Sequence, residues 1–421
     1  MTRSLRRLAT LAGSLAFGFA LMALTAQTAT QTAAAGTLVI NAGTSDPAPK
    51  QAFEELIERF EAENPDIEVK LNVFDHEGFK TSVRNFLSSQ APDVITWFAG
   101  NRMKTFVDRN LLEDVSDVWE DNGLKDAMPS SLSAMTVDGK QYGVPWSYYQ
   151  WGVYYRRDIF EEMGLTAPKT WDEFMAVNEK LKAGGVTPIA IGTKYLWTAG
   201  GWFDYLNLRV NGLPFHLELM DGKVPYTDDR VRAVFDKWRQ MVDAGHFLEN
   251  HATYSWQEAQ PFVFQGKAAM YLIGNFFVPF FPAEIADKMD FFQFPVINPD
   301  VPMYEDAPID TVHIPARAQN KEDARKFLAF VARADNQTAM NKVLERLPPN
   351  KEATVKDDRF LQAGFTMLSE SEGLAQFYDR DTDPEMAKLG MQGFQEFMVK
   401  PDRLDRILDR LEKSRQRIFK Q

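Results

Sequence analysis

Residues 37–98 read TLVINAGTSDPAPKQAFEELIERFEAENPDIEVKLNVFDHEGFKTSVRNFLSSQAPDVITWF. Three short segments of this stretch are rich in apolar residues, as strands are, and two longer segments between them repeat their apolar residues at helical spacing. The expected strands are residues 37–43, 67–74 and 92–98, and the expected helices are residues 49–65 and 78–90. This order predicts right-handed crossovers in a mostly parallel sheet, and therefore an α/β fold.

Polar and aromatic residues stand where the strands of this unit end. Ligands of parallel α/β sheets bind outside the carboxyl ends of the strands, so residues at these positions are candidates for ligand binding. They are Thr44, Ser45 and Asp46 after the first strand, and Trp97 and Phe98 at the end of the third.

The rest of the chain continues the alternation of strands and helices. Residues 170–185 open with Thr170 and place Glu173 three positions later, which predicts a capping box at the start of a helix. The chain has 421 residues, whereas single cores stop growing at roughly 250–300 residues. We therefore expect two α/β lobes, each a mostly parallel sheet flanked by helices, with several chain crossings between them.

The first 35 residues have the pattern of a secretory signal peptide. Arg3, Arg6 and Arg7 precede a weakly apolar run that ends in small residues, and a strand-like segment follows Ala35. We expect cleavage after Ala35, with cleavage after Ala26 as the alternative. An uncleaved membrane anchor is the competing interpretation, because the run is almost long enough to span a bilayer. Its glycines and alanines disfavour an anchor.

Composition indicates which cellular compartment and which classes of partner the protein has. The chain has a net charge of −12 and no Lys/Arg stripe interleaved with aromatic residues, which disfavours a nucleic-acid partner. It has no cysteine, so disulfides and a lipid-anchored cysteine are excluded. Export without such an anchor favours a freely diffusing protein of a Gram-negative periplasm.

Five motifs are spread along nearly the whole mature chain. They read FEAENPDIEVK, APDVITWFAG, DGKQYGVPWSYYQWGVYYRRDIFEEMGLTAPKTWDEF, FVFQGKAAMYLIGNF and EDARKFLAFVARADNQ. In their order and spacing the chain resembles the extracellular solute-binding proteins of ABC importers, in the sugar-binding family that includes the maltodextrin-binding proteins. The resemblance implies a two-lobed periplasmic binding protein fold that closes on a sugar or sugar derivative. It also implies the permease subunits of an ABC transporter as partners, and we expect a monomer.

The resemblance further implies three segments that cross between the lobes. They are expected near residues 146–150, 294–298 and 346–350. The first lobe would then comprise residues 36–147 and about 296–345, and the second lobe residues 148–295 and about 350–421.

The first expected crossing falls within PWSYYQWGVYYRRD, residues 145–158, in which six residues are aromatic. A pyranose has a C–H face that stacks on such rings and a rim of hydroxyls that needs polar partners. We therefore expect an aromatic-lined cleft with a few fixed polar groups. The candidate ligand-binding residues are Ser45, Asp46, Trp97, Phe98, Tyr149, Gln150, Trp151, Gly201, Trp202, Gly274, Asn275, Phe276, Asp310 and Arg346.

The sequence lacks the local motifs of zinc proteases, nucleophile elbows and P-loops, and its five histidines lack metal-ligand spacing. We therefore expect no catalytic residue, no metal site and no cofactor. Two alternatives stay open. One is an exported glycoside hydrolase, whose cleft also combines rings with carboxylates, and the other is a receptor for a polyamine, a peptide or an oxyanion. A sugar with an anionic group also stays open, because Arg102, Arg209 and Arg346 could each contact an anion.

Overall fold

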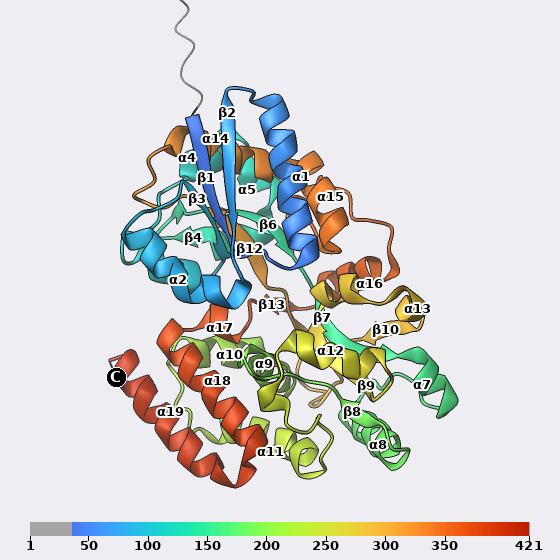
Figure 1. Cartoon of the computed structure of the whole chain (residues 1–421). Helices are drawn as coiled ribbons and strands as arrows, with labels where there is room; N and C mark the ends of the chain where they lie inside the picture. Colours follow the sequence, from blue (N-terminus) through green and yellow to red (C-terminus); the bar gives the residue numbers. More distant parts are fainter. Residues whose placement is uncertain (1–35, 421) are drawn as a thin grey trace, which may run out of the picture.

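The computed structural model describes residues 36–420 of the chain. The predicted signal peptide, residues 1–35, therefore lies outside the described residues. Figure 1 shows two lobes, each a sheet with helices packed around it, and the chain passes between them at the middle of the molecule. This arrangement confirms the predicted two-lobed α/β fold. Within residues 36–420, no helix has both the length and the apolar character needed to cross a membrane.

The first lobe is built on a five-stranded sheet in the order β2-β1-β3-β12-β6. Its strands are β1 (Gly36–Ala42), β2 (Ile67–Val73), β3 (Val94–Phe98), β6 (Val144–Tyr148) and β12 (Ile309–His313). β1 pairs with β2 and β3 in parallel, as predicted, and β12 is antiparallel to both of its neighbours. The carboxyl ends of β1, β2 and β3 therefore meet at one edge of the sheet, which faces the second lobe in Figure 1.

Helices pack around this sheet and enclose the first core. They are α1 (Pro47–Glu63), α2 (His76–Ser88), α3 (Asn101–Val107), α4 (Ser116–Asp121), α5 (Leu124–Ala127), α6 (Pro129–Leu132), α14 (Lys321–Ala332) and α15 (Ala334–Leu344). A short hairpin joins β4 (Thr136–Val137) to β5 (Lys140–Gln141). α1 buries Phe53, Leu56, Ile57 and Phe60, the residues whose spacing predicted it.

The second lobe is built on a four-stranded sheet in the order β10-β7-β9-β8. Its strands are β7 (Trp151–Arg156), β8 (Thr187–Ile189), β9 (Ala268–Gly274) and β10 (Met289–Phe292). β7 is antiparallel to β9 and to β10, and β8 is parallel to β9. Each of the two main sheets therefore contains one reversed strand, β12 in the first lobe and β7 in the second, among strands that share a direction.

Helices of the second lobe surround this sheet and carry the C-terminus. They are α7 (Arg157–Glu162), α8 (Trp171–Ala183), α9 (Trp197–Val210), α10 (Gly212–Met220), α11 (Asp229–Asp243), α12 (Trp256–Phe264), α13 (Ala283–Ala286), α16 (Arg359–Ser369), α17 (Tyr378–Asp381), α18 (Pro384–Val399) and α19 (Leu404–Ile418). The predicted capping box of α8 is confirmed, because the Glu173 amide donates to the Thr170 hydroxyl at 3.3 Å and the Thr170 amide donates to the Glu173 carboxylate at 3.2 Å. A separate parallel pair joins β11 (Tyr304–Asp306) to β13 (Gly373–Ala375).

Three crossing segments lie side by side between the lobes. The amide of Tyr148 donates to the carbonyl of Leu347 at 3.0 Å, and the amide of Leu347 donates back at 2.9 Å. Ile309 pairs with Tyr148 on the other side. Hinges between lobes are built from a few residues at the ends of elements. These paired segments therefore form the natural hinge of the molecule.

The second crossing does not lie where the resemblance placed it. Phe294 is fully buried in the second core, and the amide of Val296 donates to the carbonyl of Lys169 at 2.9 Å. Residues 294–298 are thus held in the second lobe, and the chain crosses near Ala307, between β11 and β12. The first crossing lies near its expected position. The third crossing lies later than residues 346–350, because the amide of Lys351 still donates to the Ala127 carbonyl and the amide of Thr354 to the Thr338 hydroxyl, both at 2.9 Å, in the first lobe. The chain enters the second lobe between Thr354 and α16. The exact lobe boundaries stay a prediction.

Candidate functional site

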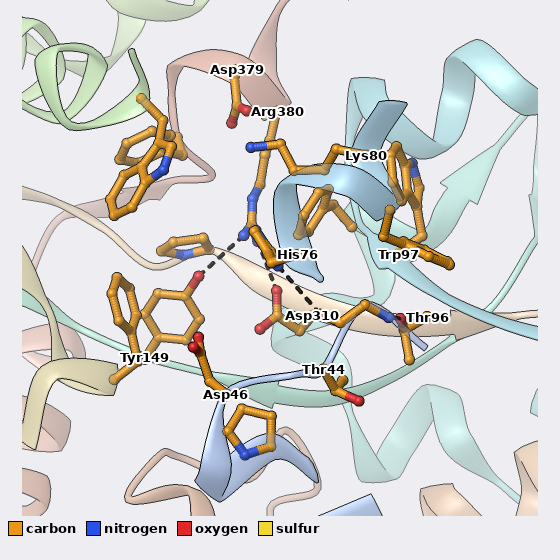
Figure 2. A pocket seen from close by; sticks show the side chains of 18 of the residues that line it. Thr44, Asp46, His76, Lys80, Thr96, Trp97, Tyr149, Asp310, Asp379 and Arg380 are labelled. Carbon is orange, nitrogen blue, oxygen red and sulfur yellow. Dashed lines mark hydrogen bonds and ion pairs between the residues drawn. The ribbon is translucent and has the colours of Figure 1, made fainter. Parts of the chain in front are cut away.

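A cavity lies between the lobes, at the edge where the first-lobe strands end. Thr44 follows β1, His76 opens α2 after β2, and Trp97 and Phe98 end β3, and all four line the cavity. Figure 2 shows Thr44, His76 and Trp97 around this space. Parallel strands bring their carboxyl ends to one edge, so residues distant in sequence meet there. The first lobe adds polar groups through Asp46, Lys80 and Thr96.

The second lobe contributes a wall of aromatic rings. Its rings are Trp151 of β7, Trp197 and Trp256 at the starts of α9 and α12, Phe276 after β9, and Phe377 before α17. Trp256 meets Phe276 edge to face with ring centroids 5.1 Å apart, and the Trp151 and Phe377 centroids are 4.9 Å apart. Rings that brace one another in this way form a rigid apolar surface.

Tyr149 connects this wall to the charged floor of the cavity. Its ring packs edge to face on Phe276 at 5.2 Å, and its hydroxyl accepts a hydrogen bond from Arg380 at 3.1 Å. Burial raises the pKa of Tyr149 to about 12. The hydroxyl therefore keeps its hydrogen at neutral pH, and within residues 36–420 no other partner takes it. It can donate that hydrogen to a ligand.

Asp310 of β12 forms the centre of a buried ion cluster. One carboxylate oxygen lies 2.6 Å from Arg346 and the other lies 3.2 Å from Arg380. Figure 2 shows Arg380 between Asp310 and Tyr149. The Arg380 guanidinium also lies over the Phe98 ring at 4.2 Å, and Arg346 lies over the Tyr149 ring at 4.7 Å. Charges fixed from several sides in this way are oriented before a ligand arrives.

Further charged and titratable groups line the same cavity. Burial alone would raise the pKa of Asp379, but the positive charges of Arg102, Lys80 and Arg380 outweigh it and lower that pKa below the ordinary value. Burial, followed by the charge of Lys80, lowers the pKa of His76, so this imidazole is neutral at pH 7. The cavity lining therefore carries three cations, Lys80, Arg346 and Arg380, and three carboxylates, Asp46, Asp310 and Asp379.

Direct bonds join the lobes beside the cavity. Arg102 of α3 donates to the carboxylate of Asp379 at 2.6 Å and to its carbonyl at 2.7 Å. The side-chain amide of Asn101 donates to the backbone carbonyl of Asp381. These bonds connect the first lobe to α17 of the second lobe, and they exist only while the lobes are close together.

Arg102→Ala is therefore expected to shift the ligand-free protein toward an open state. Hydrogen bonds to charged groups contribute about 1.5–3 kcal/mol, and losing that amount from the closed state would weaken ligand affinity by roughly 10- to 150-fold. Small-angle X-ray scattering should show a larger radius of gyration without ligand. Arg59→Ala is the control, because Arg59 pairs with Asp335 inside the first lobe at 3.1 Å. Equal radii for both variants would contradict a bond that favours closure.

The structure brings together most of the residues that the sequence analysis selected. The candidates that line the cavity are Asp46, Trp97, Phe98, Tyr149, Trp151, Phe276, Asp310 and Arg346. Their contact with a ligand stays a prediction. The candidates that do not line it are Ser45, Gln150, Gly201, Trp202, Gly274 and Asn275.

Three of these six side chains are committed to other contacts. Trp202 is fully buried and packs on Phe247 and Phe294, with centroids 5.0 and 5.7 Å away, so it belongs to the second core. Gln150 donates to the carbonyl of Phe360 at 3.1 Å. Asn275 accepts from the Tyr154 hydroxyl at 2.6 Å and donates to the Glu345 carbonyl.

The other three affect the cavity indirectly or not at all. Ser45 is exposed outside the cavity. A Cβ on Gly201 would lie 2.8 Å from the Trp151 ring, and a Cβ on Gly274 would clash with the Phe276 ring. These glycines therefore allow the two rings to occupy their places in the wall, without lining the cavity themselves.

Sequence reasoning missed several lining residues. His76 and Thr96 belong to the strand ends that were searched, so the position of His76 after β2 was a usable signal. Asp379 and Arg380 gave no local signal, because α17 reaches the cavity through tertiary packing. Thr44, named as a candidate after the first strand, does line the cavity. The remaining lining residues that were not selected are Gly43, Pro49, Phe79, Lys80, Trp146, Trp197, Trp256, Pro308 and Phe377.

The sequence profile of the bacterial extracellular solute-binding protein family matches residues 44–338. The chain belongs to this family. An uncharacterised ABC transporter extracellular-binding protein of Pyrococcus horikoshii is 29% identical over 333 residues, which are 77% of this chain and 74% of the relative. The multiple sugar-binding protein of Streptococcus mutans is 25% identical over 289 residues, 67% of this chain and 68% of that protein.

Solved structures of this kind share the fold over almost the whole chain. The bacterial solute receptor AcbH, which is described with an exclusive preference for β-D-galactopyranose, superposes with a TM-score of 0.85 at 29% identity and covers 91% of this chain and 100% of its own. A chitin oligosaccharide binding protein has a TM-score of 0.82 at 21% identity, with 91% and 99% covered. At that lower identity the similarity concerns the fold.

Proposed function

We propose that this protein is the periplasmic receptor of an ABC importer, which binds a neutral sugar between its two lobes and delivers it to the permease. The observation that carries the proposal is that the cavity lining combines a cluster of aromatic rings with fixed hydrogen-bonding groups. Five rings of the second lobe pack on one side, Trp97 and Phe98 add rings from the first lobe, and the polar and charged groups come from both lobes and from the crossings. A sugar has one apolar face and a polar rim, which is the complement of this arrangement.

The charge of the cavity favours a neutral ligand. Its three cations and three carboxylates balance, and Asp310 is already paired with Arg346 and Arg380. An anionic sugar would have to compete with Asp310 for these guanidinium groups, and a polyamine would have to displace them from Asp310. Hydroxyl groups can accept from the arginines and donate to the carboxylate without disturbing the pairs. The sugar ligands of AcbH and of the S. mutans protein support the same class.

A binding role also fits the acids of the cavity better than glycoside hydrolysis. Hydrolysis needs a protonated carboxylic acid that can donate to the leaving oxygen. The pKa of Asp379 is lowered, and Asp310 is held between two guanidinium groups. The lowered pKa makes Asp379 unsuited to act as the acid, and Asp310 is committed to its two ion pairs. We propose that the protein has no catalytic activity.

The remaining parts of the proposal follow from the family and the leader. Residues 1–35 would direct export and be removed, and the mature protein would diffuse in the periplasm as a monomer. Each lobe would dock on one half of the permease. The mature chain would be more acidic than the full chain, whose net charge is −12, because Arg3, Arg6 and Arg7 are removed with the signal peptide, and complementary charge would orient it at the permease.

Calorimetric titration of the protein lacking residues 1–35 tests the proposal. The panel should contain neutral monosaccharides and oligosaccharides, and each neutral sugar should be matched with its uronic acid, as D-galactose is with D-galacturonic acid. We expect at least one neutral sugar to bind to one site per chain, at least tenfold more tightly than its uronic acid, and to be recovered intact. Binding of none of the neutral sugars, or cleavage of a glycosidic bond, would contradict the proposal.

A further inference from the structure

A second group of titratable side chains lies behind α17, outside the cavity. Asp204 of α9, Asp306 of β11, Asp381 of α17 and His216 of α10 converge there. His216 Nε2 lies 3.7 Å from Asp381 Oδ2, and His216 Nδ1 lies 4.0 Å from Asp204 Oδ1. Asp204, Asp306 and His216 are fully buried. We call these four residues the α17 acid cluster.

The α17 acid cluster has more buried polar atoms than partners. Both carboxylate oxygens of Asp306, one oxygen of Asp204 and Nε2 of His216 make no hydrogen bond. The side-chain amide nitrogen of Asn207 lies 3.2 Å from His216 Nδ1. Because an amide nitrogen can only donate, Nδ1 is the acceptor in this contact, and Nε2 is the ring nitrogen that faces Asp381. A buried carboxylate without a partner is costly, whereas a carboxylic acid in the same place can donate to a neighbouring oxygen.

Three elements and one loop place further titratable or charged groups around the cluster. The other titratable or charged groups that face it are Tyr205 and Arg209 on α9, Glu305 on β11, Tyr378, Asp379 and Arg380 on α17, and Tyr226 before α11. Arg209 is committed to Glu305, to which it donates. Arg380 is committed to Asp310 at 3.2 Å. The cluster therefore holds more negative groups than the nearby cations can balance.

The cluster fixes the turn that supplies two cavity residues. The amide of Tyr378 donates to Asp204 Oδ2 at 2.6 Å, and the amide of Gln376 donates to Asp381 Oδ2 at 3.0 Å. Asp379 and Arg380 lie between these points and line the cavity. Figure 2 shows the Arg380 side chain reaching toward Tyr149 and Asp310, with Asp379 beside its base. A change in the cluster would therefore move groups that face the ligand.

We propose that Asp204 and Asp306 together keep at least one proton in the folded protein at neutral pH, and that this proton holds α17 in place against the cavity. Burial, and then the negative charge of Asp306, raises the pKa of Asp204, and burial, then Asp381 and Glu305, raises the pKa of Asp306. Loss of the proton at alkaline pH would repel Asp204, Asp306 and Asp381 from one another and loosen α17. Within residues 36–420 no group of carboxylates and histidines has the arrangement of a metal site.

The sign of the pH dependence follows from the raised pKa values. A carboxyl whose pKa is raised in the folded state binds its proton more tightly there than in the unfolded chain. Its contribution to stability is fully present below the unfolded pKa. As pH rises above the ordinary carboxyl value, the unfolded chain loses the proton first, so stability falls until the folded pKa is passed. Across this window the ratio of folded to unfolded protein should fall roughly tenfold per pH unit for each retained proton.

Asp306→Asn tests the proposal, because an asparagine cannot ionise and offers an N–H where the acid offers O–H. Urea unfolding of the ligand-free protein should show stability decreasing from pH 5.5 to pH 8.5 more steeply in the wild type than in the variant. The difference in slope should correspond to a roughly tenfold change in the ratio of folded to unfolded protein per pH unit. Hydrogen exchange at residues 376–381, corrected for intrinsic rates, should lose protection at pH 8.5 in the wild type alone. Asp405→Asn is the control, since the Asp405 side chain is 84% exposed and should keep the wild-type slope.

Equal slopes in wild type and Asp306→Asn would overturn the proposal. So would stabilisation by Ca²⁺ that requires Asp306, because the cluster would then hold a cation. If the variant does not fold, infrared spectroscopy of the wild type decides instead. A protonated carboxylic C=O band at pH 7.5 is expected, and its absence would overturn the proposal. The effect on ligand affinity rests on the proposed function, whereas stability, exchange and infrared absorption do not, so the two can fail separately.

Discussion

Asp310→Ala is expected to lower the free energy of unfolding by about 3–5 kcal/mol. Within residues 36–420, Asp310 is the only carboxylate that forms an ion pair with Arg346. It also pairs with Arg380, which it faces from the first lobe. Both guanidinium groups are nearly buried, so they would keep their charge without a counter-charge beside it. Urea unfolding at pH 7, followed by tryptophan fluorescence, measures the loss. Ligand affinity should fall as well, because Arg380 would no longer be held against the cavity floor.

Asp405→Ala is the matched control for this prediction. Asp405 pairs with Arg232 at 2.6 Å, the same distance as the Asp310–Arg346 pair, but its side chain is 84% exposed. Exposed ion pairs contribute about 0–1 kcal/mol. A similar loss of stability in both variants would mean that the Asp310 cluster is solvated rather than buried, and the description of the cavity floor would be wrong.

Trp151→Ala and Trp202→Ala form a pair that separates the cavity wall from the core. Each removes a buried indole, so each should cost about 3–5 kcal/mol of stability. Only Trp151 lines the cavity, next to Phe377, whereas Trp202 packs between Phe247 and Phe294. Trp151→Ala should therefore also weaken the affinity of the folded protein for its sugar by roughly 5- to 150-fold, the equivalent of about 1–3 kcal/mol.

Melting temperature and calorimetric affinity should be measured on both variants. Unchanged affinity in Trp202→Ala shows that loss of core packing alone does not impair the site. Unchanged affinity in Trp151→Ala, alongside clear destabilisation, would remove Trp151 from the site and leave Trp197 and Trp256 as the rings on which a sugar could stack.

Local patterns in the sequence predicted the elements that depend on local physics. The spacing of Phe53, Leu56 and Phe60 predicted α1, and Thr170 with Glu173 predicted the capping box of α8. Periodicity and capping act within one or two turns, so they can be read without knowledge of the fold. The strand-end rule likewise placed candidates at the edge that forms the cavity.

The errors concern side chains whose roles are set by distant partners. Gly201 and Trp202 are neighbours in an aromatic, glycine-containing segment, and composition could not tell that Trp202 faces the core. Residues 294–298 were expected to cross between the lobes, but Val296 pairs with the backbone at Lys169 in the second lobe. Arg380 reaches the cavity from a segment 70 residues after Asp310, its partner. Sequence spacing contains no signal for such a meeting.

The central claim is that a sugar binds in the cavity between the lobes, with its apolar face on the aromatic wall. The most direct measurement is a crystal structure of the protein with the sugar that binds most tightly in the calorimetric panel. The account predicts one sugar within contact of Trp151, Trp197 or Trp256 on one face, and hydrogen-bonded to Asp310 or Arg380 at its rim. A sugar bound elsewhere, or one that touches only one lobe while the cavity stays empty, would contradict it.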